Sequence, residues 1–209
     1  MGRLLRENRQ VVIELRADRD AARRRFTLAH ELAHLTLDLS SNRQAVLHQR
    51  TPGARHAEEE RLCDAIAAAL LMPRDLVEDL AGRLGVGYKL VVRVAEKTRC
   101  SLPAATARVG DVMQVRALLA EPGRAVRGGH RLEPISRRPN GVNGPVTLAC
   151  SRSDLWSERA IDRRGVWIKV GSRHGLATAQ IRSRGRRRVV LLTDIEWSEA
   201  HSHPNAGTS

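Results

Sequence analysis

The hydrophobic pattern of this 209-residue chain changes near residue 115, and this change constrains the fold more than any other feature. Before that point, apolar residues recur every three or four positions, which is typical of amphipathic helices. After it, a stretch rich in Gly, Pro and Arg (RGGHRLEPISRRPNGVNGP) leads to the apolar runs PVTLAC, GVWIKV and VVLLTDI, which predict strands. The pattern predicts an α+β protein with a mainly helical part at residues 1–114, a small β-rich C-terminal domain at 115–197 and a disordered tail at 198–209.

The first part of the chain predicts a short N-terminal strand followed by helices. The β-branched run at residues 11–13, followed by Glu14 and Leu15, gives the strand, and Asp18 or Asp20 caps a helix through RRRFTLAHELAHLTL. Residues 39–57 are polar and predict a loop. A second helix is expected over residues 58–72, with a buried side formed by Leu62, Ile66, Ala69 and Leu70.

Pro73 ends that second helix, and a third is expected from Asp75 until Gly85. Residues 88–114 predict a pair of short helices with a helix-turn-helix-like outline, in which Ser101 is the N-cap of the second helix.

Composition and charge exclude several classes of protein. The net charge of +13 favours an acidic partner or a polyanion, but the aromatic content of 2% argues against a protein that stacks single-stranded bases on aromatic side chains. Cys63, Cys100 and Cys150 are odd in number and form no CxxC pair, so neither a disulfide framework nor a thiolate zinc site is predicted. The N-terminus has no signal-peptide pattern, and the longest apolar run, at residues 65–72, is too short for a bilayer. We expect a cytoplasmic protein without a membrane partner.

The segment His30-Glu31-Leu32-Ala33-His34 indicates a metal site. Histidines four residues apart lie one turn apart on the same face of a helix and can bind one Zn²⁺ together. The side chain of Glu31 points about 100° away from that of His30, which suits a base acting on a zinc-bound water better than a metal ligand. The alternative is a helix with two incidental histidines, which would be costly to bury without partners.

A catalytic zinc site needs a third protein ligand, and the second helix offers one. Glu60 and Asp64 are one turn apart, so Glu60 could complete a His₂Glu site while Asp64 orients an imidazole from outside the metal shell. The alternative is that Glu58, Glu59 and Glu60 form a solvated acidic first turn that matches the helix dipole.

These segments resemble a known family. FTLAHELAHLTL followed by EERLCDAIAAALLMP is similar to the ImmA/IrrE zinc metallopeptidases, whose members carry RFTLAHELGH and then a helix that ends in LLMP. The resemblance covers roughly residues 9–115. It implies a zincin-like metallopeptidase core, zinc bound by His30, His34 and Glu60, and Glu31 as the catalytic base. Asp64 stands where many members have Asn, and the chain is expected to be truncated ahead of the metal helix relative to the family.

The resemblance also implies a role in regulation. The expected role is limited cleavage of a helix-turn-helix repressor or antitoxin that releases stress-response, prophage or mobile-element genes. For the group that stabilises the oxyanion, Tyr88 and His56 are candidates by residue type alone, and each has an alternative role as a packed ring or a loop residue.

Other interpretations remain open at this point. In one, residues 88–114 dock on DNA or on a protein and the metal site is structural or degenerate, although residues 102–114 offer only Arg108 and Gln114 for base contacts. In another, residues 115–197 sense a ligand or recognise the substrate, for which plain core packing is the simpler explanation. The run RGRRRVV at residues 184–190 could make weak, non-specific nucleic-acid contacts, although such runs are more often solvated turns.

Overall fold

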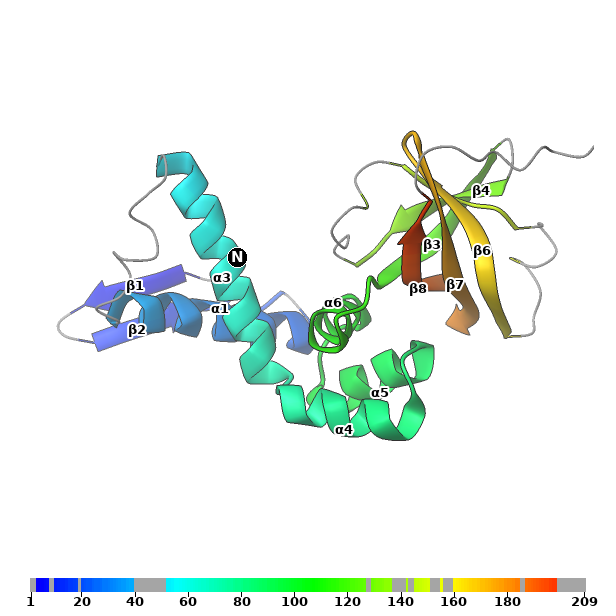
Figure 1. Ribbon diagram of the computed structural model, residues 1–209. Helices are drawn as coiled ribbons and strands as arrows, with labels where there is room; N and C mark the ends of the chain where they lie inside the picture. The colour runs from blue at the N-terminus through cyan, green and yellow to red at the C-terminus, as the bar shows by residue number, and fades with distance from the viewer. Residues whose placement is uncertain are drawn as a thin grey trace, which may run out of the picture.

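The computed structural model describes residues 3–7, 10–18, 20–39, 52–126, 129–136, 142, 145–150, 155, 160–184 and 187–198. It confirms the α+β class: helices fill the middle of the chain, a two-stranded hairpin precedes them, and a closed barrel follows (Figure 1). The hairpin and the barrel lie at opposite ends of the molecule, with the helices between them (Figure 1). Among the described residues, no helix has the length and apolar character needed to span a bilayer.

The N-terminal segment is a hairpin rather than the single strand that the sequence predicts. Strands β1 (Arg3–Glu7) and β2 (Gln10–Glu14) pair antiparallel, with Leu5 opposite Val12. Leu4 and Leu5 lie between charged residues, and this short run is too weakly patterned to predict a strand without its partner.

Five helices follow the hairpin within the described residues. Helix α1 (Ala21–Leu39) begins after Asp20, whose carboxylate accepts a hydrogen bond from the Arg23 N–H at 2.8 Å, so Asp20 rather than Asp18 is the cap. The others are α3 (Pro52–Leu71), α4 (Arg74–Leu84), α5 (Tyr88–Thr98) and α6 (Leu102–Met113). The Ser101 hydroxyl accepts from the Ala104 N–H at 3.3 Å, which confirms the predicted cap of α6.

The buried side of α3 differs from the prediction. Cys63 and Ala67 are fully buried, whereas Leu70 is 58% exposed and Ala69 is also exposed. Helix α3 also begins earlier than residue 58, at Pro52. The apolar residues of this helix lie on more than one side, so their spacing alone did not identify the face that packs against α1.

The C-terminal part is a closed antiparallel barrel of six strands in sequence order. They are β3 (Leu118–Val126), β4 (Gly129–Pro134), β5 (Val146–Leu148), β6 (Ile161–Val170), β7 (Arg173–Arg184) and β8 (Arg187–Trp197). The sequence predicted β5, β6 and β8 from their apolar runs. It missed β3, β4 and β7, because Pro, Gly and charged residues interrupt the alternation in β3 and β4, and Arg, His and Gly open β7.

The barrel and helices α4 to α6 share a hydrophobic core. Alternate residues of β3 and β8 point to opposite sides: Leu118, Ala120, Val190 and Leu192 fill the barrel, whereas Leu119, Val189 and Leu191 pack with the helices. The Tyr88 N–H at the start of α5 donates to the Gln180 side chain on β7 at 2.6 Å.

Strand β3 starts just after the boundary expected near residue 115, and the division into separate domains there stays a prediction. Residues 199–209 of the expected tail lie outside the described residues.

Helix α6 leaves little surface for a partner. Within α6 only Asp111 is exposed, because the helix packs against α3, α4, α5 and β3. The Arg108 Nε donates to the Met72 carbonyl at 2.8 Å, and the Gln114 amide donates to the Asp111 carbonyl at 2.6 Å. Both side chains that sequence analysis considered for base contacts are therefore engaged within the protein.

Candidate metal centre

Helices α1 and α3 position the histidines and carboxylates of the candidate site. The two helices pack against each other (Figure 1). The buried residues of α1 are Ala29 and Ala33, and those of α3 are Cys63 and Ala67. Such small side chains let the helix axes approach closely, so that polar side chains beside the contact can meet.

His30, His34 and Glu60 meet at one point between these helices. The two Nε2 atoms are 3.1 Å apart, and the Glu60 carboxylate oxygens lie 3.4 Å from Nε2 of His30 and 3.3 Å from Nε2 of His34. The imidazole rings lie edge to face, at 72°. One ligand atom from each residue lies within 4.8 Å of the others, and all three residues are partly buried.

Two further carboxylates contact the outer nitrogens of the imidazoles. Asp64 Oδ1 lies 3.0 Å from His30 Nδ1, which is the contact expected of Asp64 from the sequence. Glu59 Oε1 lies 3.4 Å from His34 Nδ1. From the sequence, Glu59 is expected only as part of an acidic first turn. The sequence gives one clue to its contact with His34: Glu59 directly precedes Glu60, on a helix that faces two histidines.

These contacts match the surroundings of histidines that bind a metal. With an ion bound at Nε2, the Nδ1 of His30 would donate to Asp64 and each Nε2 would present its lone pair to the ion. The two Nε2 atoms and the Glu60 carboxylate converge on one point, where three ligand atoms could hold a cation. Ligand atoms about 2.0–2.1 Å from a tetrahedral Zn²⁺ are about 3.3 Å apart, close to the spacing found between these three residues. The donor set fits zinc.

Cys63 lies on α3 between Glu60 and Asp64 but does not belong to the group of converging ligand atoms. Burial, together with the charges of Glu59, Glu60, Asp64 and Glu31, raises the pKa of this thiol to about 11. Without a metal, the thiol therefore stays protonated near neutral pH. The cysteines among the described residues are all free.

Glu31, the predicted base, is half-buried on α1 and lies near enough to α3 for its charge to contribute to the pKa of Cys63.

The two candidates for an oxyanion partner lie in different places. Tyr88 packs on the core of α4 to α6 under the Arg182 guanidinium, 5.9 Å from its ring centroid. His56 is exposed on α3, one turn before Glu60. Of the two, only His56 belongs to a helix that forms the cluster.

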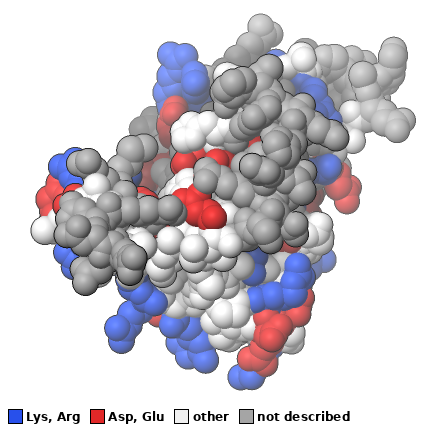
Figure 2. Space-filling model, turned by 90° about the vertical axis from the view of Figure 1, so that its left-hand side faces the viewer, with Lys and Arg blue, Asp and Glu red and all other residues white. Residues whose placement is uncertain are grey.

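Charge is unevenly distributed on the molecule. Figure 2 shows the face seen from the hairpin side, where acidic side chains lie near the middle and both basic and acidic side chains lie toward the edge. In the run at residues 184–190, the one arginine side chain that the structure describes is that of Arg188, which is half-buried, with a buried Nη1 that has no hydrogen-bond partner.

Part of the chain is similar in sequence to known metalloproteases. The chain is 38% identical over 84 residues to the radiation response metalloprotease IrrE of Deinococcus deserti, covering 40% of this chain and 30% of that protein. It is 30% identical over 108 residues to the protein of the same name from Deinococcus radiodurans, covering 50% of this chain and 33% of that one. The aligned part thus spans about a third of the length of these relatives.

A solved structure shares the fold over nearly the whole chain. It is a Mycobacterium tuberculosis transcriptional regulator, with a TM-score of 0.55 and 15% sequence identity over 92% of this chain and 61% of that one. Residues 1–109, more than half of the chain, match the IrrE N-terminal-like domain. They contain the hairpin, α1 and α3, and therefore the whole metal-ligand cluster. The chain belongs to the family of the IrrE N-terminal-like domain, a family of metallopeptidases.

Proposed function

We propose that the protein is a zinc-dependent endopeptidase with a zincin-like core formed by the hairpin, α1 and α3. The convergence of His30, His34 and Glu60 on one point carries this proposal. The two imidazoles and one carboxylate form a His₂Glu set, which leaves a fourth position for water or substrate. Asp64 and Glu59 hold the two rings with their Nε2 atoms toward that point.

Each residue of the site has a separate task in this mechanism. His30, His34 and Glu60 hold the ion, and Glu31 accepts a proton from the attacking water and passes it to the leaving amine. When bound, zinc supplies Lewis-acid chemistry by acidifying a water and polarising a peptide carbonyl. His56, exposed one turn before Glu60, is the better placed of the two oxyanion candidates.

For the substrate, we propose a helix-turn-helix repressor whose cleavage releases stress-response or mobile-element genes. The relatives from Deinococcus are named radiation response metalloproteases, which supports a stress role. The net charge of +13 favours an acidic protein substrate by electrostatic steering. Free cysteines fit a reducing cytoplasm as the site of action.

The alternative of a DNA-binding regulator has less support. A recognition helix must present several side chains to base edges. Helix α6 exposes only Asp111 among its residues, and an acidic side chain repels the phosphate backbone. We therefore do not favour a role in which α6 reads DNA.

The test combines metal content with cleavage. Wild type should hold about one equivalent of zinc by elemental analysis, Glu60→Ala should lose it, and Glu31→Gln should keep it but fail to cleave a candidate repressor. Glu78→Ala is the matched control, since Glu78 is exposed on α4 and pairs with Arg74. Folded wild type without zinc, or a Glu31→Gln variant that cleaves like wild type, would contradict the proposal.

A further inference from the structure

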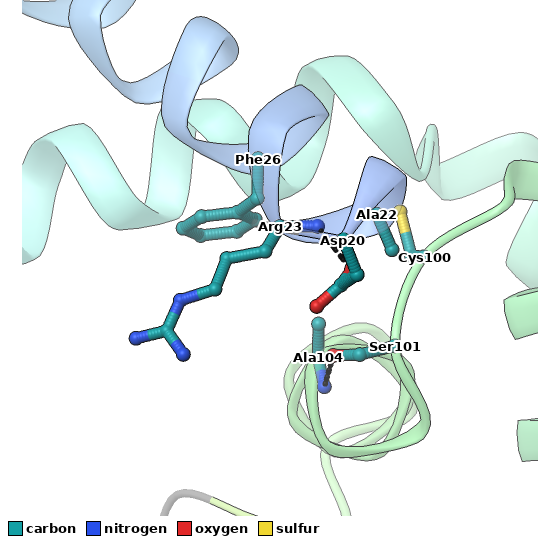
Figure 3. Close-up of a pocket in the computed structure, with 7 residues that line it drawn as sticks. All are labelled: Asp20, Ala22, Arg23, Phe26, Cys100, Ser101 and Ala104. Carbon is teal, nitrogen blue, oxygen red and sulfur yellow. Dashed lines mark hydrogen bonds between the residues drawn. The ribbon is translucent and has the colours of Figure 1, made fainter. Parts of the chain in front are cut away.

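A cavity of about 350 Å³ lies between α1 and the turn that joins α5 to α6 (Figure 3). Asp20, Ala22, Arg23 and Phe26 form its α1 side. Cys100, Ser101 and Ala104 form the opposite side. The volume is within the range of ligand pockets, about 300–1,000 Å³. None of these residues belongs to the metal-ligand cluster.

The cavity continues the face of α1 that carries the two histidines. Phe26 lies four residues before His30 and Arg23 lies three residues before Phe26, and residues at these spacings share a helix face. At 1.5 Å per residue, Phe26 is about 6 Å and Arg23 about 10 Å from His30 along the helix axis. The cavity therefore lies next to the metal-ligand cluster along the axis of α1.

This separation matches the spacing of residues in an extended peptide. A strand-like polypeptide advances about 3.3 Å per residue. A substrate whose scissile carbonyl lies at the cluster and whose chain follows α1 would therefore place a side chain two or three residues away at the cavity.

The walls of the cavity suit an apolar side chain with an acidic neighbour. The ring of Phe26, the methyl groups of Ala22 and Ala104 and the thiol of Cys100 supply apolar surface. The polar groups of Asp20 and Ser101 are occupied as helix caps, each accepting a backbone N–H (Figure 3). The exposed Arg23 side chain extends on the same side as the Phe26 ring and brings a positive charge to the rim (Figure 3).

We propose that this cavity is a specificity pocket that receives a large apolar side chain of the substrate, two or three residues from the scissile bond. Arg23 pairs with an acidic residue next to that side chain. The proposal rests on the proposed peptidase function. It assigns substrate selection to residues of α1 and α6 that do not bind the metal.

Cleavage of matched peptides tests the pocket. One set of peptides carries Phe, Leu or Ala at the second and third positions on either side of the cut site, and a second set carries Glu or Lys beside that residue. In Ala104→Leu the added side chain fills the cavity, so kcat/KM should fall at least about tenfold for the Phe peptide and stay within about twofold for the Ala peptide. Arg23→Glu should reverse the preference from Glu to Lys.

Two further variants control for misfolding and for the bulk that Ala104→Leu adds. Phe26→Ala enlarges the cavity and should reduce the preference for Phe over Ala. Ala69→Leu adds the same bulk as Ala104→Leu at an exposed position of α3 and should leave the cleavage profile unchanged.

The outcomes separate the pocket from the catalytic site. Active wild type whose profile is unchanged in all the pocket variants would overturn the pocket and leave the peptidase proposal intact. Equal losses for Phe and Ala peptides in Ala104→Leu and Phe26→Ala would also overturn it. Wild type that cleaves no peptide, or cleavage that persists in Glu31→Gln, would overturn the peptidase function and the pocket with it.

Discussion

A carboxylate faces the Nδ1 atom of each imidazole in the cluster, so the orientation of the rings depends on residues outside the proposed ligand set. Asp64 contacts His30 at 3.0 Å, a shorter distance than the 3.4 Å between Glu59 and His34. A hydrogen bond to Nδ1 fixes the tautomer and raises the basicity of the other nitrogen. The affinity of the site is therefore shared between ligands and supporting groups.

Asp64→Ala should weaken zinc binding by about 10- to 100-fold without removing it, because His30 loses the group that orients its ring. Competition with a zinc chelator measures the change. Asp79→Ala is the control, since Asp79 is exposed on α4 and pairs with Arg83. Unchanged affinity in Asp64→Ala would show that the contact with His30 does not support the ligand.

The three thiols should differ in reactivity. Cys63 is fully buried with a pKa raised to about 11, whereas Cys100 and Cys150 are partly exposed. A thiolate-specific reagent at pH 8 should label Cys100 and Cys150 in the folded protein and Cys63 only after unfolding. Mass spectrometry of the labelled peptides identifies the sites, and rapid labelling of Cys63 in the folded state would contradict the burial.

At the scale of elements, the contact between α1 and α3 decides whether the site forms. Ala33 is fully buried, next to His34 in sequence. Ala33→Leu should push the helices apart, cost about 1–3 kcal/mol of unfolding free energy and lower zinc affinity. Leu32→Met, at a 40% exposed position on the same helix, should change neither quantity. Chemical denaturation and zinc titration measure both, and wild-type zinc affinity in Ala33→Leu would contradict the prediction.

The sequence alone predicted the parts of the site that depend on local spacing. His30, Glu31 and His34 follow from one helix turn, and Glu60 with Asp64 follow from another. The contact of Glu59 with His34 was missed because it depends on how α3 rotates against α1, which helix period does not determine. In the barrel, strands with long apolar runs were predicted, whereas β4, with its Gly, His and Arg residues, forms through pairing with β3 and β5.

At the scale of the whole molecule, the barrel and the helices should unfold together. Leu119, Val189 and Leu191 of the barrel belong to the same core as α4, α5 and α6. Tryptophan fluorescence reports on the C-terminal part alone, because all three tryptophans, Trp156, Trp167 and Trp197, lie there, whereas circular dichroism at 222 nm reports mainly on the helices. The two urea transitions should coincide. Separate midpoints would show independent domains.

The metal cluster also joins segments that are distant in the chain. Its ligands come from α1 and from α3, on either side of residues 40–51. With the proposed ligation, a bound ion acts as a cross-link between α1 and α3 in the folded state, and its binding energy adds to the folding free energy of the amino-terminal part. The stability gained rises with the logarithm of the free ion concentration. The fraction of chains with a folded peptidase core would then follow the zinc supply of the cell.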